Sequence, residues 1–442
     1  MDDTGTTLAE EVHPGPSAPR HRATAFMMAL GLTVPALVLR VGGVHSLPHP
    51  VEALLFGLAV VGASFLLAWA AEAAQLDIGA GLAIAVLALI AVLPEYAVDA
   101  VFAWKSGHGF KQFGRTCHAP GATGESPCSL ALANMTGSNR LLIGIGWSMV
   151  VAVAWWQWRK RKMPDKAIVL PRPRSVEIGY LTVATMYALT LPLRRSLTLI
   201  DAAVLVLLFA AYTRRVAGGP SEEPHLVGPA QAIGSLAQKR RRITIVVMLV
   251  FAATVILASA EPFAEALVAT GRSAHINEFL LVQWLAPLAS EAPELLVAGL
   301  FAWRLNTDQA LSTLVSSKVN QWTLLVGTLP IIFAISSGSW HGLPLGVGQR
   351  DELLLTAAQA AFAVAVLASL SLSIREAIML FSLFWAQFIV GAVVPTRWHG
   401  SERIVVSIAY LGLAVVFLFR QRGAMRAVLH DGFLRSYDEM AT

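Results

Sequence analysis

The sequence predicts an all-α polytopic membrane protein with about twelve transmembrane helices, and three observations support this fold class. Of its 442 residues, 56% are hydrophobic and 14% are charged, whereas soluble domains are usually ~45–50% apolar and ~25% charged. The mean hydropathy is +0.62. The apolar residues also gather in runs of about 20, the length that a helix needs to cross a bilayer.

The elements follow in order from these runs. Residues 1–23 are acidic and contain several Pro and Gly, so we expect a disordered cytoplasmic tail; a secretory signal would begin with basic residues. Twelve apolar segments come next, at approximately 24–44, 50–74, 80–104, 128–157, 176–193, 196–213, 243–265, 276–303, 311–338, 351–371, 376–395 and 403–420.

Basic residues predict the orientation of these segments. With a cytoplasmic N-terminus and twelve crossings, 21 Lys and Arg residues fall inside, 10 fall outside, and Arg140 and Lys318 lie within the membrane, which accounts for all 33. This excess agrees with the positive-inside rule. We therefore expect a multi-pass protein of the cell (cytoplasmic) membrane with both termini in the cytoplasm. The net charge of +5 needs no nucleic-acid partner, and no P-loop predicts a nucleotide.

Cysteine and histidine usage narrows the chemistry further. Two cysteines are too few for a disulfide scaffold or an iron–sulfur cluster. Cys117 and Cys128 lie in one polar loop that the topology places outside, where a disulfide is possible. All eleven histidines fall in tails or loops, which argues against a haem inside the bilayer. We expect no cofactor.

The two halves of the chain resemble one another. The first contains ALIAVLPEYAVDAVFAWKSG around Glu95, and the second contains APLASEAPELLVAGLFAWRLN around Glu294. A segment of small residues follows each, beginning at Ala131 and at Ala310. Both glutamates lie in the second helix of a five-helix block, so the two blocks have opposite orientations. Inverted repeats of this kind place a binding site at the midplane of the membrane.

This duplication predicts how the chain is divided. We expect an extra N-terminal helix, a first inverted repeat, a basic cytoplasmic linker, a second inverted repeat, and an extra C-terminal helix with a cytoplasmic tail. These parts cover residues 24–49, 50–213, 214–242, 243–395 and 396–442, with the duplicated motifs at 85–146 and 284–330.

Six ionisable side chains lie deep in the apolar segments: Glu95, Asp99, Arg140, Glu291, Glu294 and Lys318. Each would cost roughly 2.5–3.5 kcal/mol if it faced lipid, so all of them must face protein or water. Four carboxylates against two basic groups leave a formal charge of −2, which attracts cations or protons. Pro94 and Pro293 each precede a glutamate and free backbone carbonyls that can coordinate a cation.

The Pro-Glu helices, followed by Ala-Asn-Met-Thr-Gly-Ser-Asn at 133–139, resemble the alpha repeats of the calcium/cation antiporter superfamily, the sodium/calcium exchanger membrane region. The resemblance covers roughly residues 50–395 and implies a ten-helix core with inverted two-fold symmetry. It implies a secondary antiporter that exchanges Ca²⁺ or Na⁺ against Na⁺ or H⁺ by alternating access, with inorganic cations and the lipid bilayer as its partners.

The same resemblance implies which residues bind the ion. Glu95 and Glu294 match the central metal-binding carboxylates. The residues that match the surrounding polar ligands are Asn134, Ser138, Thr313 and Ser317.

The sequence departs from the family pattern at several of these places. The hydroxyl residues before the first Pro-Glu are replaced by Ala91 and Val92, whereas the second repeat has Ser290 and Glu291, which join the expected cation ligands. Lys318 stands where the family has a neutral amide.

We hypothesise that Lys318 pairs with Glu95 or Glu291 in the empty site and yields to an arriving cation or proton. Asp99 and Arg140 are expected at the cavity wall, in gating or proton coupling.

Other interpretations remain open at this point. The buried charges could form structural salt bridges, and a site closed by Lys318 would make the protein a non-transporting sensor or scaffold of the same fold. A channel would share the acidic cavity but would show passive flux. An enzyme is not expected, because no nucleophile and base stand together in the membrane segments.

Overall fold

The protein is described here from a computed structural model that covers residues 19–43, 47–77, 92–121, 124–164, 167–219, 226, 228–393 and 399–441. Within these residues, eight helices are long and apolar enough to cross a membrane, or nine if one bent pair counts as a single span. The prediction of an all-α polytopic membrane protein is confirmed. The total of twelve crossings stays a prediction.

Helices cover each predicted segment of the first half wherever it is described. The third segment lies outside the described residues up to position 91 and then continues as α4. In order, the elements are α1 (Pro19–Gly42), α2 (His49–Ala74), α4 (Leu93–Phe113), η1 (Gly114–Thr116), α5 (Pro127–Leu130), α6 (Ala133–Leu141), η2 (Leu142–Trp147), α7 (Ser148–Lys160), β1 (Ile168–Val169), η3 (Arg172–Arg174), α8 (Ser175–Ala188), η4 (Leu191–Leu193), β2 (Ser196–Leu197) and α9 (Leu199–Ala217).

The second half repeats this order after a short helix in the linker. Its elements are α10 (Pro229–Gly234), α11 (Gln238–Ala274), α12 (Glu278–Ser290), α13 (Ala292–Trp303), α14 (Thr307–Asn320), η5 (Gln321–Leu325), α15 (Val326–Ser337), β3 (Leu343–Pro344), α16 (Val347–Leu367), β4 (Ser371–Leu372), α17 (Ile374–Val393), α18 (His399–Arg420), α19 (Arg422–Phe433) and α20 (Tyr437–Ala441).

Three expectations about individual segments are corrected. Helix α11 extends well beyond the predicted 243–265, because good helix formers such as Lys and Arg continue it outside the apolar run. The segment predicted as one helix at 276–303 is two helices, α12 and α13, bent by 54°. The predicted C-terminal tail contains α19, which packs on α8.

The two Pro-Glu helices begin in the same way. The residue before each helix, Val92 for α4 and Glu291 for α13, has a φ of −94° and a ψ within a few degrees of zero. In each helix a proline occupies the second position and a glutamate the third. Proline fits the first turn because its missing N–H has no partner there in any helix. Both glutamates therefore sit at the positive end of a helix in the interior of the molecule.

The polar segments that follow also correspond. The first passes from α6 into the π-helical turn η2, and the second passes from α14 into the π-helical turn η5. A shift of 179 positions, which superposes Ala131 on Ala310, also superposes the first residues of these turns, Leu142 and Gln321. π-Helical turns are rare and often mark functional sites.

Two short strand pairs support the inverted arrangement. β1 pairs antiparallel with β4, and β2 pairs antiparallel with β3. Each pair joins a loop of the first half to a loop of the second. β1 and β3 both precede the fourth helix of a five-helix block, and β2 and β4 both precede the fifth, so a two-fold axis exchanges the two pairs.

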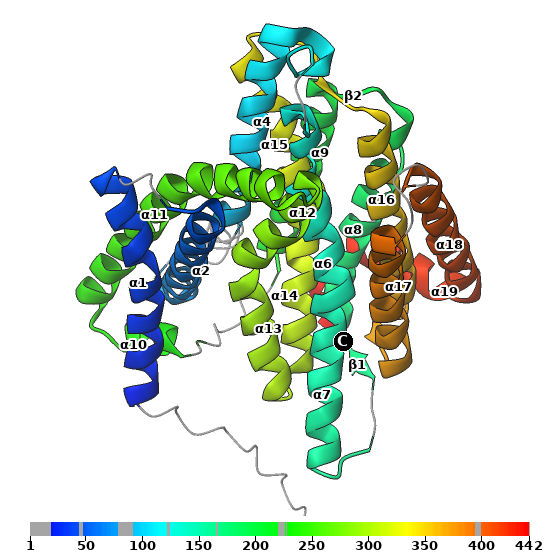
Figure 1. The fold of residues 1–442 in the computed structure, drawn as a ribbon. Coiled ribbons are helices and arrows are strands. Elements are labelled where there is room, and N and C mark those ends of the chain that lie inside the picture. Colours follow the sequence, from blue (N-terminus) through cyan, green and yellow to red (C-terminus); the bar gives the residue numbers. More distant parts are fainter. Residues whose placement is uncertain are drawn as a thin grey trace, which may run out of the picture.

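Helix packing joins the two halves of the chain (Figure 1). α2 packs along α11, α4 packs against α15, and α6 packs against α12. α1 packs on α2 towards one edge of the molecule, and α18 packs on α16 towards the opposite edge. Gly137 in α6 allows the backbones of α6 and α12 to touch, because a Cβ there would lie 1.7 Å from the carbonyl oxygen of Gln283.

Candidate cation-binding site

Four carboxyl groups from both halves of the chain converge in the interior. Glu95 and Asp99 stand one turn apart on α4, and Glu291 and Glu294 lie at and after the bend between α12 and α13. Glu95, Asp99 and Glu291 are buried, with at most 3% of their surface exposed, and Glu294 is half-buried. Glu95 and Glu294 reach this position because each lies in the first turn of a helix that begins inside the molecule, and Glu291 lies at the bend just before α13.

These carboxyl groups are electrostatic neighbours. The charge of Glu95 acts on Asp99, on Glu291 and on Glu294. Several of their oxygens are buried without a hydrogen-bond partner: Oε1 of Glu95, both oxygens of Asp99, Oε2 of Glu291 and Oε2 of Glu294. Buried charges are normally paired or bound to ions, so these oxygens are available to a cation or to protons.

Two neutral side chains from α6 face the same group. Asn134 lies beside Asp99, and Ser138 lies beside Glu95 and Glu291. Both side chains are 0% exposed, and their polar atoms have no hydrogen-bond partner. Because buried polar groups in native proteins are nearly always satisfied, these side chains are candidates to bind a ligand together with the carboxylates.

The expected ligands from α14 are placed differently. The Thr313 hydroxyl donates to the carbonyl of Gln309, 2.8 Å away in the preceding turn, a local bond that Ser and Thr often form in helices. Ser317 is half-buried. No contact resolved among the described residues joins Thr313 or Ser317 to a carboxylate. Ser290 is buried, and its hydroxyl donates to the carbonyls of Ala286 and Pro287.

Gln321 takes part in the site although it was not predicted. Its Nε2 donates to Oε1 of Glu291 at 2.6 Å, and its own Oε1 is buried without a partner. It follows Ser317 by four residues, so it lies on the same helix face one turn later. That spacing was the signal in the sequence that could have identified it.

Lys318 does not pair with Glu95 or Glu291, and the hypothesis of such a salt bridge is wrong for this conformation. Its ammonium donates to the backbone oxygen of Asn139 and, at 2.6 Å, to Oδ1 of the same residue. It also lies over the ring of Trp322, 5.6 Å from the centroid. Asn139 offers two oxygen acceptors, its backbone carbonyl and Oδ1. The buried ammonium of Lys318 is therefore hydrogen-bonded without contacting a carboxylate of the site.

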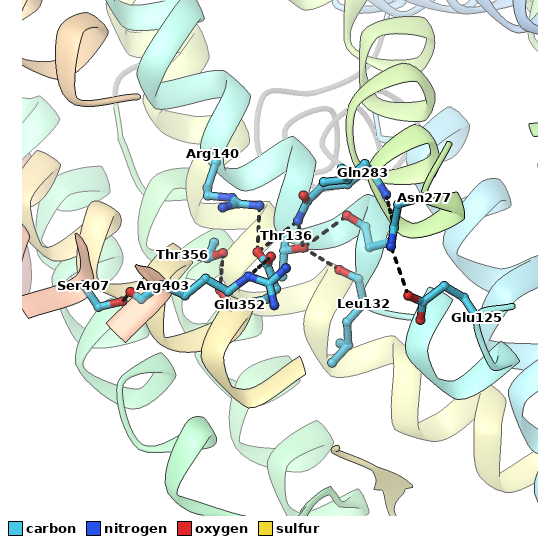
Figure 2. Close-up of polar contacts among 12 residues, drawn as sticks. Glu125, Leu132, Thr136, Arg140, Asn277, Gln283, Glu352, Thr356, Arg403 and Ser407 are labelled. Carbon is cyan, nitrogen blue, oxygen red and sulfur yellow. Dashed lines mark hydrogen bonds and ion pairs between the residues drawn. The ribbon is translucent and has the colours of Figure 1, made fainter. Parts of the chain in front are cut away.

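Arg140 likewise has a partner outside the carboxylate group (Figure 2). It forms an ion pair with Glu352 of α16 at 2.8 Å, and Arg403 of α18 contacts the other oxygen of Glu352 at 2.7 Å. Gln283 donates to Glu352 and to Thr136, both at 3.1 Å. The sequence did not indicate this network, because Glu352 and Arg403 lie at the ends of apolar segments, where solvated charge is the ordinary interpretation.

The network closes a vestibule of about 680 Å³. Apolar side chains such as Phe279, Trp284 and Phe388 line its walls, and Arg140, Glu352 and Arg403 lie among its lining residues. None of the four carboxylates of the site lines it. The vestibule lies between those ends of α12, α16 and α18 that the predicted topology places outside the cell.

The chemistry of the site suits a hard cation. Among the described residues, no three carboxylate, histidine or cysteine side chains are arranged to hold a metal ion by themselves. An ion must therefore also use amide, hydroxyl or backbone oxygens, which Asn134, Ser138 and Gln321 supply. Mixed oxygen ligands of this kind are typical of Ca²⁺.

The cysteines are joined outside the site. Cys117 and Cys128 form a disulfide with a Cα–Cα distance of 5.9 Å. It links the turn after α4 to the start of α5, and Gln349 of α16 donates to the backbone oxygen of Cys128 at 2.6 Å. The disulfide joins the ends of α4 and α5, and the hydrogen bond from Gln349 adds the start of α16, next to the vestibule.

Solved structures show the same fold. The crystal structure of the H⁺/Ca²⁺ exchanger CAX is 42% identical in sequence and has a TM-score of 0.82, covering 93% of this chain and 98% of that chain. The structure of native YfkE is 13% identical with a TM-score of 0.57, covering 88% of this chain and 99% of that chain, a likeness in fold alone. No curated protein matches this chain.

A family model gives the same assignment. The model described as sodium/calcium exchanger protein matches residues 51–217 and 244–422, on either side of the predicted basic linker. These two stretches make up most of the chain and contain all four carboxylates of the site. The resemblance found in the two Pro-Glu motifs is confirmed, and the chain belongs to the sodium/calcium exchanger protein family, whose members are membrane transporters of cations.

Proposed function

We propose that this protein is a secondary antiporter that exchanges Ca²⁺ for H⁺ across the cell membrane by alternating access. The observation that carries the proposal is the set of buried carboxylates from both repeats whose oxygens have no partner. The 42% identical relative, whose structure is that of an H⁺/Ca²⁺ exchanger, supports this choice of ions.

Charge balance favours a divalent ion that alternates with protons. Glu95, Asp99, Glu291 and Glu294 carry four negative charges when ionised, and Lys318 supplies one positive charge. Arg140 and Arg403 both pair with Glu352, outside this group. The formal charge that remains is −3, and one Ca²⁺ or two protons each reduce it by the same amount, to −1. Either can therefore replace the other without changing the charge buried in a medium of low dielectric constant.

The helix geometry supports alternating access. The α12–α13 pair is bent by 54° at the site, and discontinuous helices of inverted repeats commonly present ions to one side and then to the other. The Arg140–Glu352–Arg403 network joins α6, α16 and α18 beside the vestibule, and we assign it the role of a gate on that side. Opening towards that side requires these contacts to rearrange.

Flux in proteoliposomes tests the proposal. With an imposed pH gradient, the wild type should accumulate Ca²⁺ and move H⁺ in the opposite direction, and Glu95→Gln and Glu294→Gln should each reduce Ca²⁺ uptake at least a hundredfold. Glu261→Gln is the matched control, because this α11 carboxylate is half-exposed and only loosely paired with Arg40; its uptake should equal that of the wild type. Ca²⁺ flux without H⁺ counterflux, or unchanged uptake in both glutamine variants, would overturn the proposal.

A further inference from the structure

We infer that the Lys318 ammonium is a tethered cation that permanently fills one cation position at the centre of the molecule, so that the site takes Ca²⁺ without an accompanying monovalent cation. The inference deepens the proposed function and rests on it, because it concerns which ions share the same site.

The position of Lys318 follows from the symmetry of the chain. The shift of 179 positions that superposes the polar segments after the two Pro-Glu helices also relates Asn139 to Lys318, and these two side chains contact one another. Two symmetry-related residues can touch only where they straddle the pseudo-two-fold axis. The ammonium therefore lies on the axis, at the point where the halves meet.

The surroundings of the ammonium are those of a bound cation. Two oxygens of Asn139, the backbone carbonyl and Oδ1, accept hydrogen bonds from it, and oxygen acceptors of this kind also coordinate hard cations. The Trp322 ring, at 5.6 Å, provides the cation–π contact that an ammonium favours. Lys318 is 0% exposed, so no water reaches it from the surface.

The lysine also belongs electrically to the ion site. It is an electrostatic neighbour of Glu291 and Glu95, and in the part of the chain that the structure describes its hydrogen bonds go to Asn139 and not to these carboxylates. It thus lowers the negative charge of the site by one and leaves the carboxylate oxygens free. A side chain is bound covalently and cannot be transported, so a position filled in this way is closed to Na⁺ and K⁺.

Replacing the lysine should open that position. In Lys318→Asn the two equivalent positions both carry an amide, and the site regains one negative charge together with a cavity lined by amide and carbonyl oxygens. We expect purified Lys318→Asn to bind about one ²²Na⁺ per chain, whereas the wild type binds none. In proteoliposomes, replacing choline by Na⁺ should raise Ca²⁺ uptake by this variant at least fivefold and leave that of the wild type unchanged.

Two further measurements keep the test decisive. Lys105→Asn is the matched control, because this lysine of α4 is outside the site and pairs with Glu265; it should bind no Na⁺. The wild-type binding assay does not depend on whether a variant folds, and stoichiometric ²²Na⁺ binding to the wild type would overturn the inference. So would a folded Lys318→Asn that binds Ca²⁺ but no Na⁺. The ²²Na⁺ binding assay is done in detergent and needs no transport. Failure of the Lys318 inference can therefore be distinguished from failure of the proposed Ca²⁺/H⁺ exchange, which the proteoliposome assay tests.

Discussion

Ser138 in the first polar segment and Thr313, the equivalent of Asn134 in the second, both carry hydroxyls that the sequence predicts as ligands, yet these hydroxyls have different surroundings. The Ser138 oxygen has no partner and lies beside two carboxylates, whereas the Thr313 hydroxyl is engaged with its own helix. A hydroxyl without a hydrogen-bond partner can coordinate a cation without first breaking a hydrogen bond. The site is therefore less symmetric than the sequence motifs that build it.

This asymmetry predicts different effects of two small substitutions. Ser138→Ala should weaken Ca²⁺ binding about tenfold, equivalent to about 1.4 kcal/mol, because an oxygen is lost next to Glu95 and Glu291. Thr313→Ala should change it less than twofold. Isothermal titration of both variants with Ca²⁺ measures the effect, and equal losses in the two would show that both hydroxyls coordinate the ion.

At the scale of elements, the approach of α6 to α12 decides whether Asn134 and Ser138 reach the carboxylates at all. Gly137→Ala would place a methyl group 1.7 Å from a backbone oxygen of α12, and neither backbone can yield without separating the helices. Overpacking typically costs about 1–3 kcal/mol and occasionally more.

We therefore expect Gly137→Ala to lower the melting temperature clearly and to abolish Ca²⁺ uptake. Gly31→Ala in α1 is the matched control, since nothing lies within 4 Å of a Cβ there, and it should be neutral or slightly stabilising. A stable and active Gly137→Ala would mean that α6 and α12 do not pack so closely.

The disulfide gives a second prediction about elements. Closing a loop between residues 11 positions apart should contribute about 3 kcal/mol by restricting the unfolded chain. Cys117→Ser combined with Cys128→Ser should lower the melting temperature in non-reducing buffer, and wild type treated with a reductant should match the variant. Melting temperatures that agree with and without reductant in the wild type would show that the bond does not form.

At the scale of the molecule, an ion pair distant in sequence from the site residues joins the two repeats. Asp77 follows α2 and accepts hydrogen bonds from Arg241, at 2.7 and 2.9 Å, and from Arg242 of α11. The hydrogen bonds from Arg241, reinforced by Arg242, hold the pKa of Asp77 well below its usual range. The ion pair thus links equivalent helices of the two repeats at the end that the predicted topology places in the cytoplasm.

The lowered pKa predicts how this link responds to acid. Its contribution to stability, up to about 1 kcal/mol for a pair near the surface, is complete above the ordinary carboxyl pKa of about 4. It is lost as the pH falls below that value and through the lowered pKa. Asp77→Asn should therefore melt earlier than the wild type by a constant margin between pH 8 and 5, and the margin should shrink below pH 4. A margin that grows on acidification would contradict this.

The membrane fold and the family could be predicted from the sequence alone, and the duplicated motif that predicts Glu95 and Glu294 as ligands corresponds to two helices that begin in the same way. These properties depend on short stretches of sequence: apolar runs long enough to cross a membrane and two short motifs. Because a charged side chain is costly in a membrane, the charged residues within those runs indicate where a functional site lies. The tertiary structure decided which of several polar side chains face the site. It brought Asn139 to Lys318 across 179 positions and joined Arg140 to Glu352 and Arg403. Such contacts depend on how helices rotate and pack against one another, and no local pattern in the chain specifies that.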